Sequence, residues 1–247
     1  MPPVDDAIVR PIKGRRSPEL GPLAFLIATA LDLTEIRRRL ALPREESRHL
    51  FTSRMWQTSQ ATIVGPMVGA PYAVMVLETL ISWGARRFLF LGWCGALVEA
   101  LQIGDILLPD SAIVDEGTSG HYRNASQSII AEPSVQMNAE IQAQIQDAAI
   151  PSRSGRVWST DGVFRETPEK VRRFTRMGAQ SVDMETSALF TVAAFRRVDL
   201  AALLVVSDTL AGMRWQHGFR TEAFARGRSA ALDVVLQMLP RPNQGER

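Results

Sequence analysis

Two acidic residues, Glu185 and Asp208, stand just after short apolar stretches of the sequence. A carboxylate can accept hydrogen bonds from two adjacent hydroxyl groups, which is what the cis-diol of a ribose presents. A second carboxyl group nearby would have its pKa raised by burial and by like charge, so it could donate a proton to a leaving group near neutral pH. The same residues also suit plainer roles, Glu185 in the first turn of a helix and Asp208 as a helix cap or turn residue. Their spacing leaves both interpretations open.

Four candidate strands end in small, polar or acidic residues. These ends are Gly92-Trp93-Cys94-Gly95, Thr160-Asp161-Gly162, Asp183-Met184-Glu185 and Ser207-Asp208-Thr209. In open α/β sheets the ligand crevice lies at the carboxyl ends of the strands. The pattern therefore predicts a ligand site at this edge, although it does not name the ligand.

The elements that must position these residues follow from the apolar periodicity. Strands are predicted over residues 23–30, 61–64, 88–91, 106–108, 156–159, 180–182 and 201–206, and helices over 71–84, 134–149, the stretch after Glu185, and 222–239. The run 201–206 is apolar throughout, as expected for a strand covered on both faces. Alternation of this kind predicts the α/β class, with a mostly parallel central sheet flanked by helices. We expect a single domain over residues 21–240, preceded by a loose N-terminal arm over residues 1–20.

Composition narrows the class of protein further. The chain has 247 residues, of which 46% are hydrophobic, and a formal net charge of +2, so disorder is not expected. Basic residues are mixed with acidic ones, which favours solvated helix faces over a nucleic-acid-binding patch. No apolar run reaches membrane-spanning length and no signal peptide is evident. With Cys94 as its one cysteine, the chain fits a reducing compartment, and we expect a cytoplasmic protein with neither nucleic-acid nor membrane partners.

Several motifs, in order and at matching spacing over about residues 58–210, resemble the purine nucleoside and uridine phosphorylase superfamily, which includes nucleosidases. They are Gly92-Trp93-Cys94-Gly95-Ala96-Leu97, Gly104-Asp105-Ile106, the stretch 115–122, the stretch 182–190 and Val205-Val206-Ser207-Asp208. The resemblance implies a phosphorylase/hydrolase-like fold with a mixed central sheet, and assembly as a homodimer or homohexamer. It implies cleavage of the N-glycosidic bond of a nucleoside, most simply phosphorolysis by a pentosyltransferase.

The same resemblance implies roles for individual residues. Met184 and Glu185 match the ribose contacts, and Asp208 matches the acid that protonates a purine leaving group, so purine nucleosides are favoured over uridine. The residues expected at the base are Val163, Phe164, Asp183 and Arg165. Leaving-group protonation and stabilisation of an oxocarbenium-like ribose would together lower the barrier to cleavage.

The expected phosphate site departs from the family pattern. The early phosphate-binding motif is absent, and the usual Arg and Ser or Thr positions hold Phe90 and Trp93. Loss of a bidentate Arg and a hydroxyl removes strong contacts to an anion. Gly92, Trp93 and Arg54 are the candidates for the phosphate or nucleophile pocket, and inorganic phosphate is the expected co-substrate.

Two alternatives to phosphorolysis remain open. One is a nucleosidase, in which water attacks the sugar with Asp32 or Glu35 as the base, although both residues also suit a helix start. The other is a non-catalytic nucleoside-binding protein that lost the phosphate site. Trp215 and Phe219 suit either a lid over the base or packing against the final helix. The His residues lack metal-ligand spacing, so neither a metal nor an organic cofactor is expected.

Overall fold

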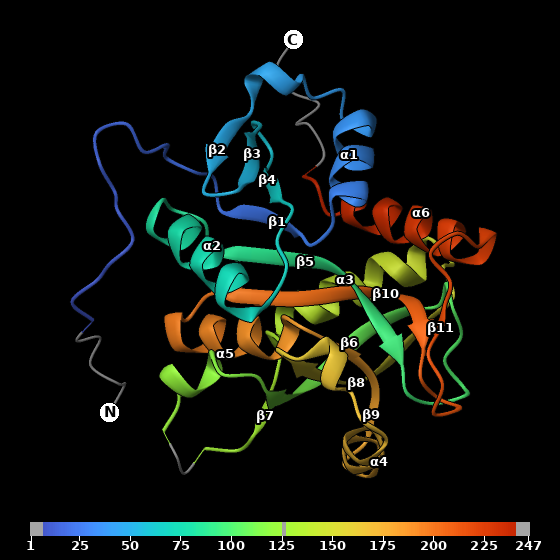
Figure 1. Cartoon of the computed structure of the whole chain (residues 1–247). Coiled ribbons are helices and arrows are strands. Elements are labelled where there is room, and N and C mark those ends of the chain that lie inside the picture. Colours follow the sequence, from blue (N-terminus) through green and yellow to red (C-terminus); the bar gives the residue numbers. More distant parts are fainter. Residues whose placement is uncertain (1–6, 125–126, 241–247) are drawn as a thin grey trace.

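The structure, a computed structural model, describes residues 7–124 and 127–240. These residues form one mixed β-sheet with helices on both faces (Figure 1). The strands are β1 (Leu23–Ile27), β2 (Arg48–Leu50), β3 (Ser53–Gln57), β4 (Thr62–Gly65), β5 (Arg87–Ala96), β6 (Ile106–Asp115), β7 (Ile130–Ala131), β8 (Ser152–Thr160), β9 (Ala179–Asp183), β10 (Asp199–Thr209) and β11 (Gln216–His217). The helices are α1 (Ala30–Arg39), α2 (Ala70–Ser82), α3 (Val135–Asp147), α4 (Pro168–Arg176), α5 (Thr186–Arg196) and α6 (Glu222–Gln237), with short 3₁₀ turns η1 (Arg44–Glu46), η2 (Ser119–His121) and η3 (Val163–Arg165).

The centre of the sheet closes on itself. Strand β5 pairs in parallel with β1 and β10 and, at its far end, antiparallel with β9. Strand β10 also pairs antiparallel with β6, and β6 and β8 continue in parallel to β9. The ring β5–β10–β6–β8–β9 therefore brings the carboxyl ends of β5, β9 and β10 together. The mixed α/β sheet expected from the sequence is confirmed.

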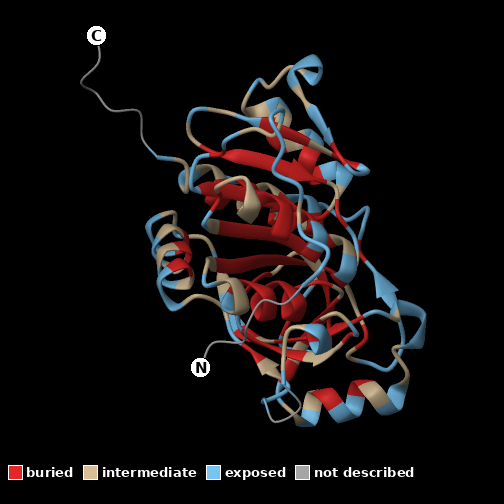
Figure 2. Cartoon of the chain, turned by 90° about the vertical axis from the view of Figure 1, so that its left-hand side faces the viewer, coloured by how far each residue is buried: buried red, intermediate tan, exposed pale blue. Residues whose placement is uncertain are grey.

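Two helical layers cover the sheet because its strands are apolar on both faces. In β10, positions 200, 202, 204 and 206 face the core shared with α2 and α5, whereas positions 201, 203 and 205 face the core shared with α1, α3 and α6. This alternation is the period-two geometry of a strand. Figure 2 shows the resulting buried sheet between its more exposed helices. The prediction of a strand covered on both faces is confirmed.

Several element boundaries differ from the sequence-based prediction. Strand β1 ends at Ile27 instead of continuing to Ala30, because Thr29 caps α1 by accepting a hydrogen bond from the backbone N–H of Asp32 at 3.2 Å. In the other direction, β5 and β10 run further than predicted. Trp93 and Cys94 continue the β5 ladder opposite Val205 and Val206, so they lie within a strand and not in a turn after it.

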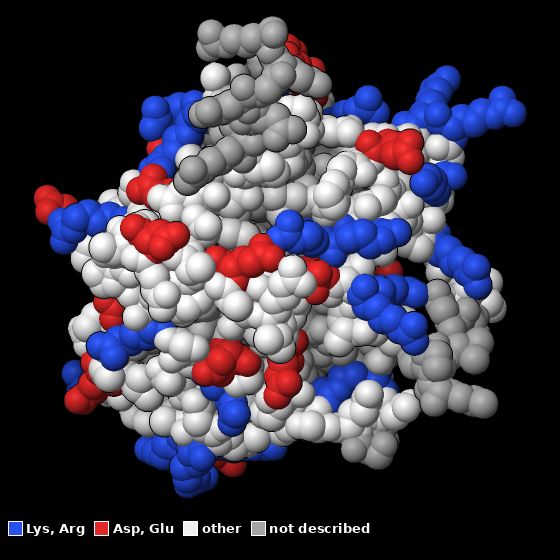
Figure 3. Space-filling view, turned by 180° about the vertical axis from the view of Figure 1, so that it is seen from behind, with Lys and Arg blue, Asp and Glu red and all other residues white. Residues whose placement is uncertain are grey.

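Charged side chains are spread over the surface. Figure 3 shows Lys and Arg interspersed with Asp and Glu on the face opposite to that of Figure 1. Within the described ranges, no helix is both long and apolar enough to cross a lipid bilayer.

Candidate active site

A cavity of about 470 Å³ opens at the carboxyl ends of β5, β9 and β10. Glu185 and Asp208 both line it, although 22 positions of chain lie between them. The sequence-based expectation that these two carboxyl groups share one cavity is therefore met by the geometry. The other lining residues are Ala28, Thr29, Val68, Trp93, Cys94, Gly95, Val163, Phe164, Glu166, Val182, Asp183, Met184, Ser207, Leu210, Trp215 and Phe219.

A β-bulge near the end of β10 aims Asp208 into the cavity. In the ladder with β5, Val206 lies opposite Cys94 and Asp208 opposite Gly95, so Ser207 is the extra residue. Gly95 leaves the space that the carboxylate uses, because a Cβ at this position would lie 3.1 Å from Asp208 Oδ2. Asp208 is thus a strand residue. The plainer interpretation of the sequence had placed it at a helix cap or in a turn.

Protein groups engage both oxygens of Asp208. The Ser207 hydroxyl donates to Oδ1 at 2.6 Å, and the indole N–H of Trp215 donates to Oδ2 at 2.9 Å. The Trp215 ring also lies 6.5 Å from that of Phe219, centroid to centroid. Trp215 precedes β11 and Phe219 follows it, and both line the cavity. The Phe219 ring also lies 6.3 Å from the ring of Phe224 in α6, so a place beside the cavity and packing against the final helix are both present.

Glu185 is free to face the cavity because a neighbouring residue caps α5. The backbone N–H of Thr186 donates to Asp183 Oδ2 at 2.9 Å, whereas Glu185 stands at the N-cap position without a side-chain capping bond. The backbone N–H of Gly69 instead donates to Glu185 Oε1 at 2.5 Å. Burial, together with the nearby charge of Asp183, raises the pKa of Glu185 to about 8.

Asp183 also lines the cavity, but protein donors occupy both of its oxygens. Oδ1 accepts from the Ser159 hydroxyl at 2.5 Å, and Oδ2 accepts from the backbone and the hydroxyl of Thr186. Its burial raises its pKa, against the effect of these hydrogen bonds. Asp183 therefore holds the β9–α5 junction together through these hydrogen bonds. Its expected contact with the base stays a prediction.

The end of the cavity near Asp208 is open and apolar. Phe164 is 95% exposed and Val163 is 45% exposed, and both line the cavity from η3. Arg165 of the same turn is not among the lining residues. Two exposed apolar side chains beside a carboxylic acid suit a planar base that would cover them.

At the expected phosphate position, the structure places an internal ion pair. The indole N–H of Trp93 donates to Asp32 Oδ2 at 2.6 Å, and Arg228 of α6 donates through Nε to Asp32 Oδ1 at 2.7 Å. The Arg228 guanidinium lies 5.5 Å from the centroid of the Trp93 ring. Among the described residues, no Lys or Arg lines the cavity.

The other phosphate-site and nucleophile candidates lie elsewhere. Arg54 donates to the Ser47 hydroxyl at 3.0 Å in the β2–β3 region, and Gly92 packs inside β5 against Phe90. Glu35 is on the outer face of α1, where hydrogen bonds from Arg38 and Arg39 lower its pKa to about 2. None of these three residues lines the cavity. The structure therefore brings together the ribose candidates and the base candidates except Arg165, whereas Trp93 is the one phosphate-pocket candidate that lines the cavity.

Three contributors were missed by the sequence analysis. Glu166 lines the cavity beside Asp208, Arg228 neutralises Asp32, and Gly69 donates to Glu185. The position of Glu166, between a turn and the Thr167-Pro168 start of α4, was the available signal for the first. The other two leave no comparable signal in the sequence, because Gly69 donates through its backbone and Arg228 is 196 positions from Asp32.

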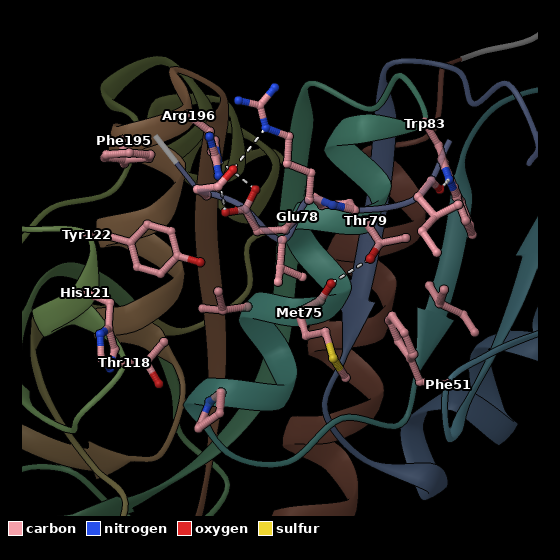
Figure 4. Close-up of a pocket in the computed structure, with 18 of the residues that line it drawn as sticks. Phe51, Met75, Glu78, Thr79, Trp83, Thr118, His121, Tyr122, Phe195 and Arg196 are labelled. Carbon is pink, nitrogen blue, oxygen red and sulfur yellow. Dashed lines mark hydrogen bonds and ion pairs between the residues drawn. The ribbon is translucent and has the colours of Figure 1, made fainter. Parts of the chain in front are cut away.

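A second hollow, of about 990 Å³, lies on the α2 and α5 side of the molecule. Its lining includes Phe51, Met75 and Tyr122, and Figure 4 shows Met75 between the other two in that view. Arg196 and Glu78 form a bidentate ion pair there, with N–O distances of 2.7 and 2.8 Å. In the part of the chain that the structure describes, no cluster of three His, Cys, Asp or Glu side chains could hold a metal ion.

Comparisons with known proteins agree with the fold. The model of the phosphorylase superfamily matches residues 18–240. A purine nucleoside phosphorylase DeoD-type from Alkaliphilus metalliredigens is 29% identical over 156 residues, which are 63% of this chain and 66% of that protein. The matched region thus spans about two thirds of the length of this relative.

Solved structures show the same architecture. A purine nucleoside phosphorylase from Toxoplasma gondii, in complex with immucillin-H, has a TM-score of 0.76 at 16% identity, covering 89% of this chain and 90% of that one. An AMP nucleosidase from Bacteroides thetaiotaomicron has a TM-score of 0.70 at 24% identity, covering 88% and 90%. The family match covers nearly the whole described chain, and the solved structures share its fold: the chain belongs to the phosphorylase superfamily.

Proposed function

We propose that this protein cleaves the N-glycosidic bond of a purine nucleoside, by phosphorolysis as its main reaction. The observation that carries the proposal is the opening of Glu185 and Asp208 onto one cavity of about 470 Å³. A cavity of this size suits a single small ligand. The purine nucleoside phosphorylase named above supports the choice of reaction.

The two carboxyl groups divide the work in this proposal. Glu185, with Met184, holds the ribose hydroxyls. Asp208 passes a proton to the purine while the C1′–N9 bond breaks, so the base leaves as a neutral molecule. Val163 and Phe164 cover the faces of the base. The nucleophile then bonds to C1′, and inorganic phosphate is the one co-substrate that the proposal requires.

Hydrolysis is the second candidate, and one observation favours it. Trp93, Asp32 and Arg228 fill the expected anion position with an ion pair that is already satisfied. The negative charge of Asp32 would repel a phosphate dianion at this position, whereas water has no net charge and would not be repelled. The structure of the nucleosidase from Bacteroides thetaiotaomicron has the same fold.

One assay distinguishes these reactions. The protein is incubated with inosine, adenosine, methylthioadenosine and uridine, with and without phosphate, and released base is measured. Release that requires phosphate supports phosphorolysis, and release without it identifies a hydrolase. Nucleoside binding without release of base, measured by calorimetry, would contradict the enzymatic proposal and leave the non-catalytic alternative.

Homo-oligomeric assembly, as a dimer or hexamer, is also part of the proposal. The 990 Å³ hollow is rimmed by exposed apolar side chains, among them Phe51 (50% exposed) and Met75 (42% exposed). Contiguous exposed apolar surface of this kind is typical of a protein–protein contact. A cytoplasmic location is proposed from the single buried cysteine, Cys94, which has no partner for an internal disulfide.

A further inference from the structure

Glu166 is a second carboxyl group at the base end of the cavity. It follows η3, precedes the Thr167 cap of α4, and lines the cavity together with Asp208. Its side chain accepts no hydrogen bond from any residue in the described ranges 7–124 and 127–240. A partly buried carboxyl group without a donor favours its neutral, protonated form.

Asp208 stands in the opposite hydrogen-bonding situation. The Trp215 indole N–H can only donate, and it lies 2.9 Å from Oδ2, while the Ser207 hydroxyl lies 2.6 Å from Oδ1. Both carboxyl oxygens of Asp208 are therefore already hydrogen-bonded to protein donors. The two carboxyl groups in this cavity differ in their donors, and Glu166 is the one that has none.

The charges around Glu166 act in the same direction. Burial, followed by the charge of Asp208 on β10, raises the pKa of Glu166 to about 7, against the effect of Lys170 on α4. The Lys170 ammonium is itself 2.8 Å from Asp115 Oδ2. Asp183 and Glu185 line the same cavity from the β9–α5 junction, so the facing groups are mostly acidic.

We propose that Glu166 and Asp208 form a carboxyl pair that holds one proton, resident on Glu166 in the empty site and delivered through Asp208 to the leaving base. This inference rests on the proposed nucleoside-cleaving function and adds a proton source to it. Glu166 thus acts through Asp208, as a positioning residue for the proton.

The proton transfer balances in three parts. Glu166 gives its proton to the Asp208 carboxylate, and Asp208 gives a proton to N7 of the purine. The electron pair of the C1′–N9 bond goes to the base, which leaves neutral, while an oxygen of the nucleophile bonds to C1′. Glu166 is left as a carboxylate and regains its proton from solvent.

The test compares Glu166→Gln with a matched control, Glu169→Gln, which removes the same charge from an exposed position on α4 three residues away. The kcat for inosine is measured from pH 5 to 9. In the unchanged protein and the control, kcat should fall as pH rises through about 7, where Glu166 loses its proton. Glu166→Gln should lower kcat by at least about tenfold, below the full value of a general acid, and abolish the inflection near pH 7. An unchanged profile in Glu166→Gln would overturn the proposal.

A second substrate separates proton supply from a structural role. 4-Nitrophenyl β-D-ribofuranoside has a leaving group that departs as an anion without protonation. Glu166→Gln should cleave it at nearly the unchanged rate while remaining slow with inosine. Equal losses with both substrates would mean that Glu166 only maintains the cavity, which contradicts the proton pair.

A readout without turnover distinguishes failure of this inference from failure of the proposed function. Infrared difference spectra report protonated carboxyl groups directly. Glu185, with its pKa of about 8, would contribute a protonated carboxyl band of its own, so all spectra are recorded in proteins that also carry Glu185→Gln. In that background a protonated carboxyl band should disappear with a midpoint near pH 7, also when Glu169→Gln is added, and be absent when Glu166→Gln is added. Persistence of the band with Glu166→Gln overturns the pair. If the band behaves as expected but no nucleoside is cleaved, the assignment of the proton to Glu166 stands and the proposed function fails.

Discussion

Two hollows of the molecule differ in size and in chemistry, and the larger of these two carries less chemistry. The groove beside α2 and α5 measures about 990 Å³, twice the cavity of about 470 Å³ at the strand ends. In the groove, Glu78 and Arg196 satisfy each other in a bidentate pair. In the cavity, burial and like charge raise the pKa values of Glu166 and Glu185 to about 7 and 8. A large volume therefore marks surface that a partner can cover, whereas carboxyl groups with a raised pKa mark a candidate reactive site.

The largest expected effect comes from Asp208→Asn, which keeps the shape of the cavity but removes its acid. Turnover of inosine should fall by about 10²- to 10⁴-fold, the range for loss of general acid catalysis. The matched control is Asp161→Asn, because Asp161 lines the groove and uses a carboxyl oxygen only to accept from the Gly117 N–H at 2.8 Å. An equal loss of turnover in both variants would contradict the assignment of the catalytic acid to the cavity and not to the groove.

Ribose recognition should depend on Glu185 by a smaller amount. Above pH 8, where Glu185 is ionised, Glu185→Gln should weaken binding of a ribonucleoside by about 1.5–3 kcal/mol, the scale of a hydrogen bond to a charged group. The measurement compares a ribonucleoside with its 2′,3′-dideoxy analogue in both proteins. The penalty for removing the hydroxyls should be large with Glu185 and small with Gln. If both proteins discriminate equally, Glu185 does not contact the sugar.

The sequence predicted the fold and the acidic end of the cavity for the same reason. Both follow from local rules: apolar periodicity defines the strands, and residues at strand ends meet at one edge of the sheet. These rules brought out Asp208 and Glu185 as candidates, whereas Val163 and Phe164, in the turn after β8, were named only through the resemblance to the family.

The anion position could not be predicted in this way. It depends on a contact between Asp32 and Arg228, which are 196 positions apart and belong to different helices. Trp93 could be read as a departure from the family pattern, but its hydrogen bond to Asp32 depends on the approach of α1 to β5. The hydrogen bonds of Asp183 could not be predicted for a related reason, since its donors on β8 and α5 meet only in the folded chain.

A third prediction concerns stability and follows from the burial of Glu185. Its pKa of about 8 in the folded protein exceeds the 4.5 expected when it is exposed, so the folded state keeps a proton that the unfolded state releases. The free energy of unfolding should therefore fall as pH rises from about 4.5 to about 8, by about 1.4 kcal/mol per unit of pKa difference.

Glu185→Gln removes this titration. Its melting temperature relative to the unchanged protein should rise between pH 5 and pH 8 and then level off. A constant difference between the two melting temperatures over that interval, measured by calorimetry at matched ionic strength, would show that Glu185 keeps an ordinary pKa in the folded protein.

The smallest expected effect on catalysis comes from a charge placed in the groove. Met75→Glu puts a carboxylate on exposed apolar surface that is proposed to contact a second copy of the chain, so it should shift sedimentation toward the monomer. The groove and the cavity share no lining residue, and turnover per chain should stay within about twofold of the unchanged protein.

Val135→Glu is the matched control, because Val135 is 86% exposed at the start of α3 and lines neither hollow. If both variants sediment like the unchanged protein, the groove is not the contact surface. If Met75→Glu abolishes turnover as well as assembly, catalysis in the cavity depends on the groove, and the two hollows do not have separate functions.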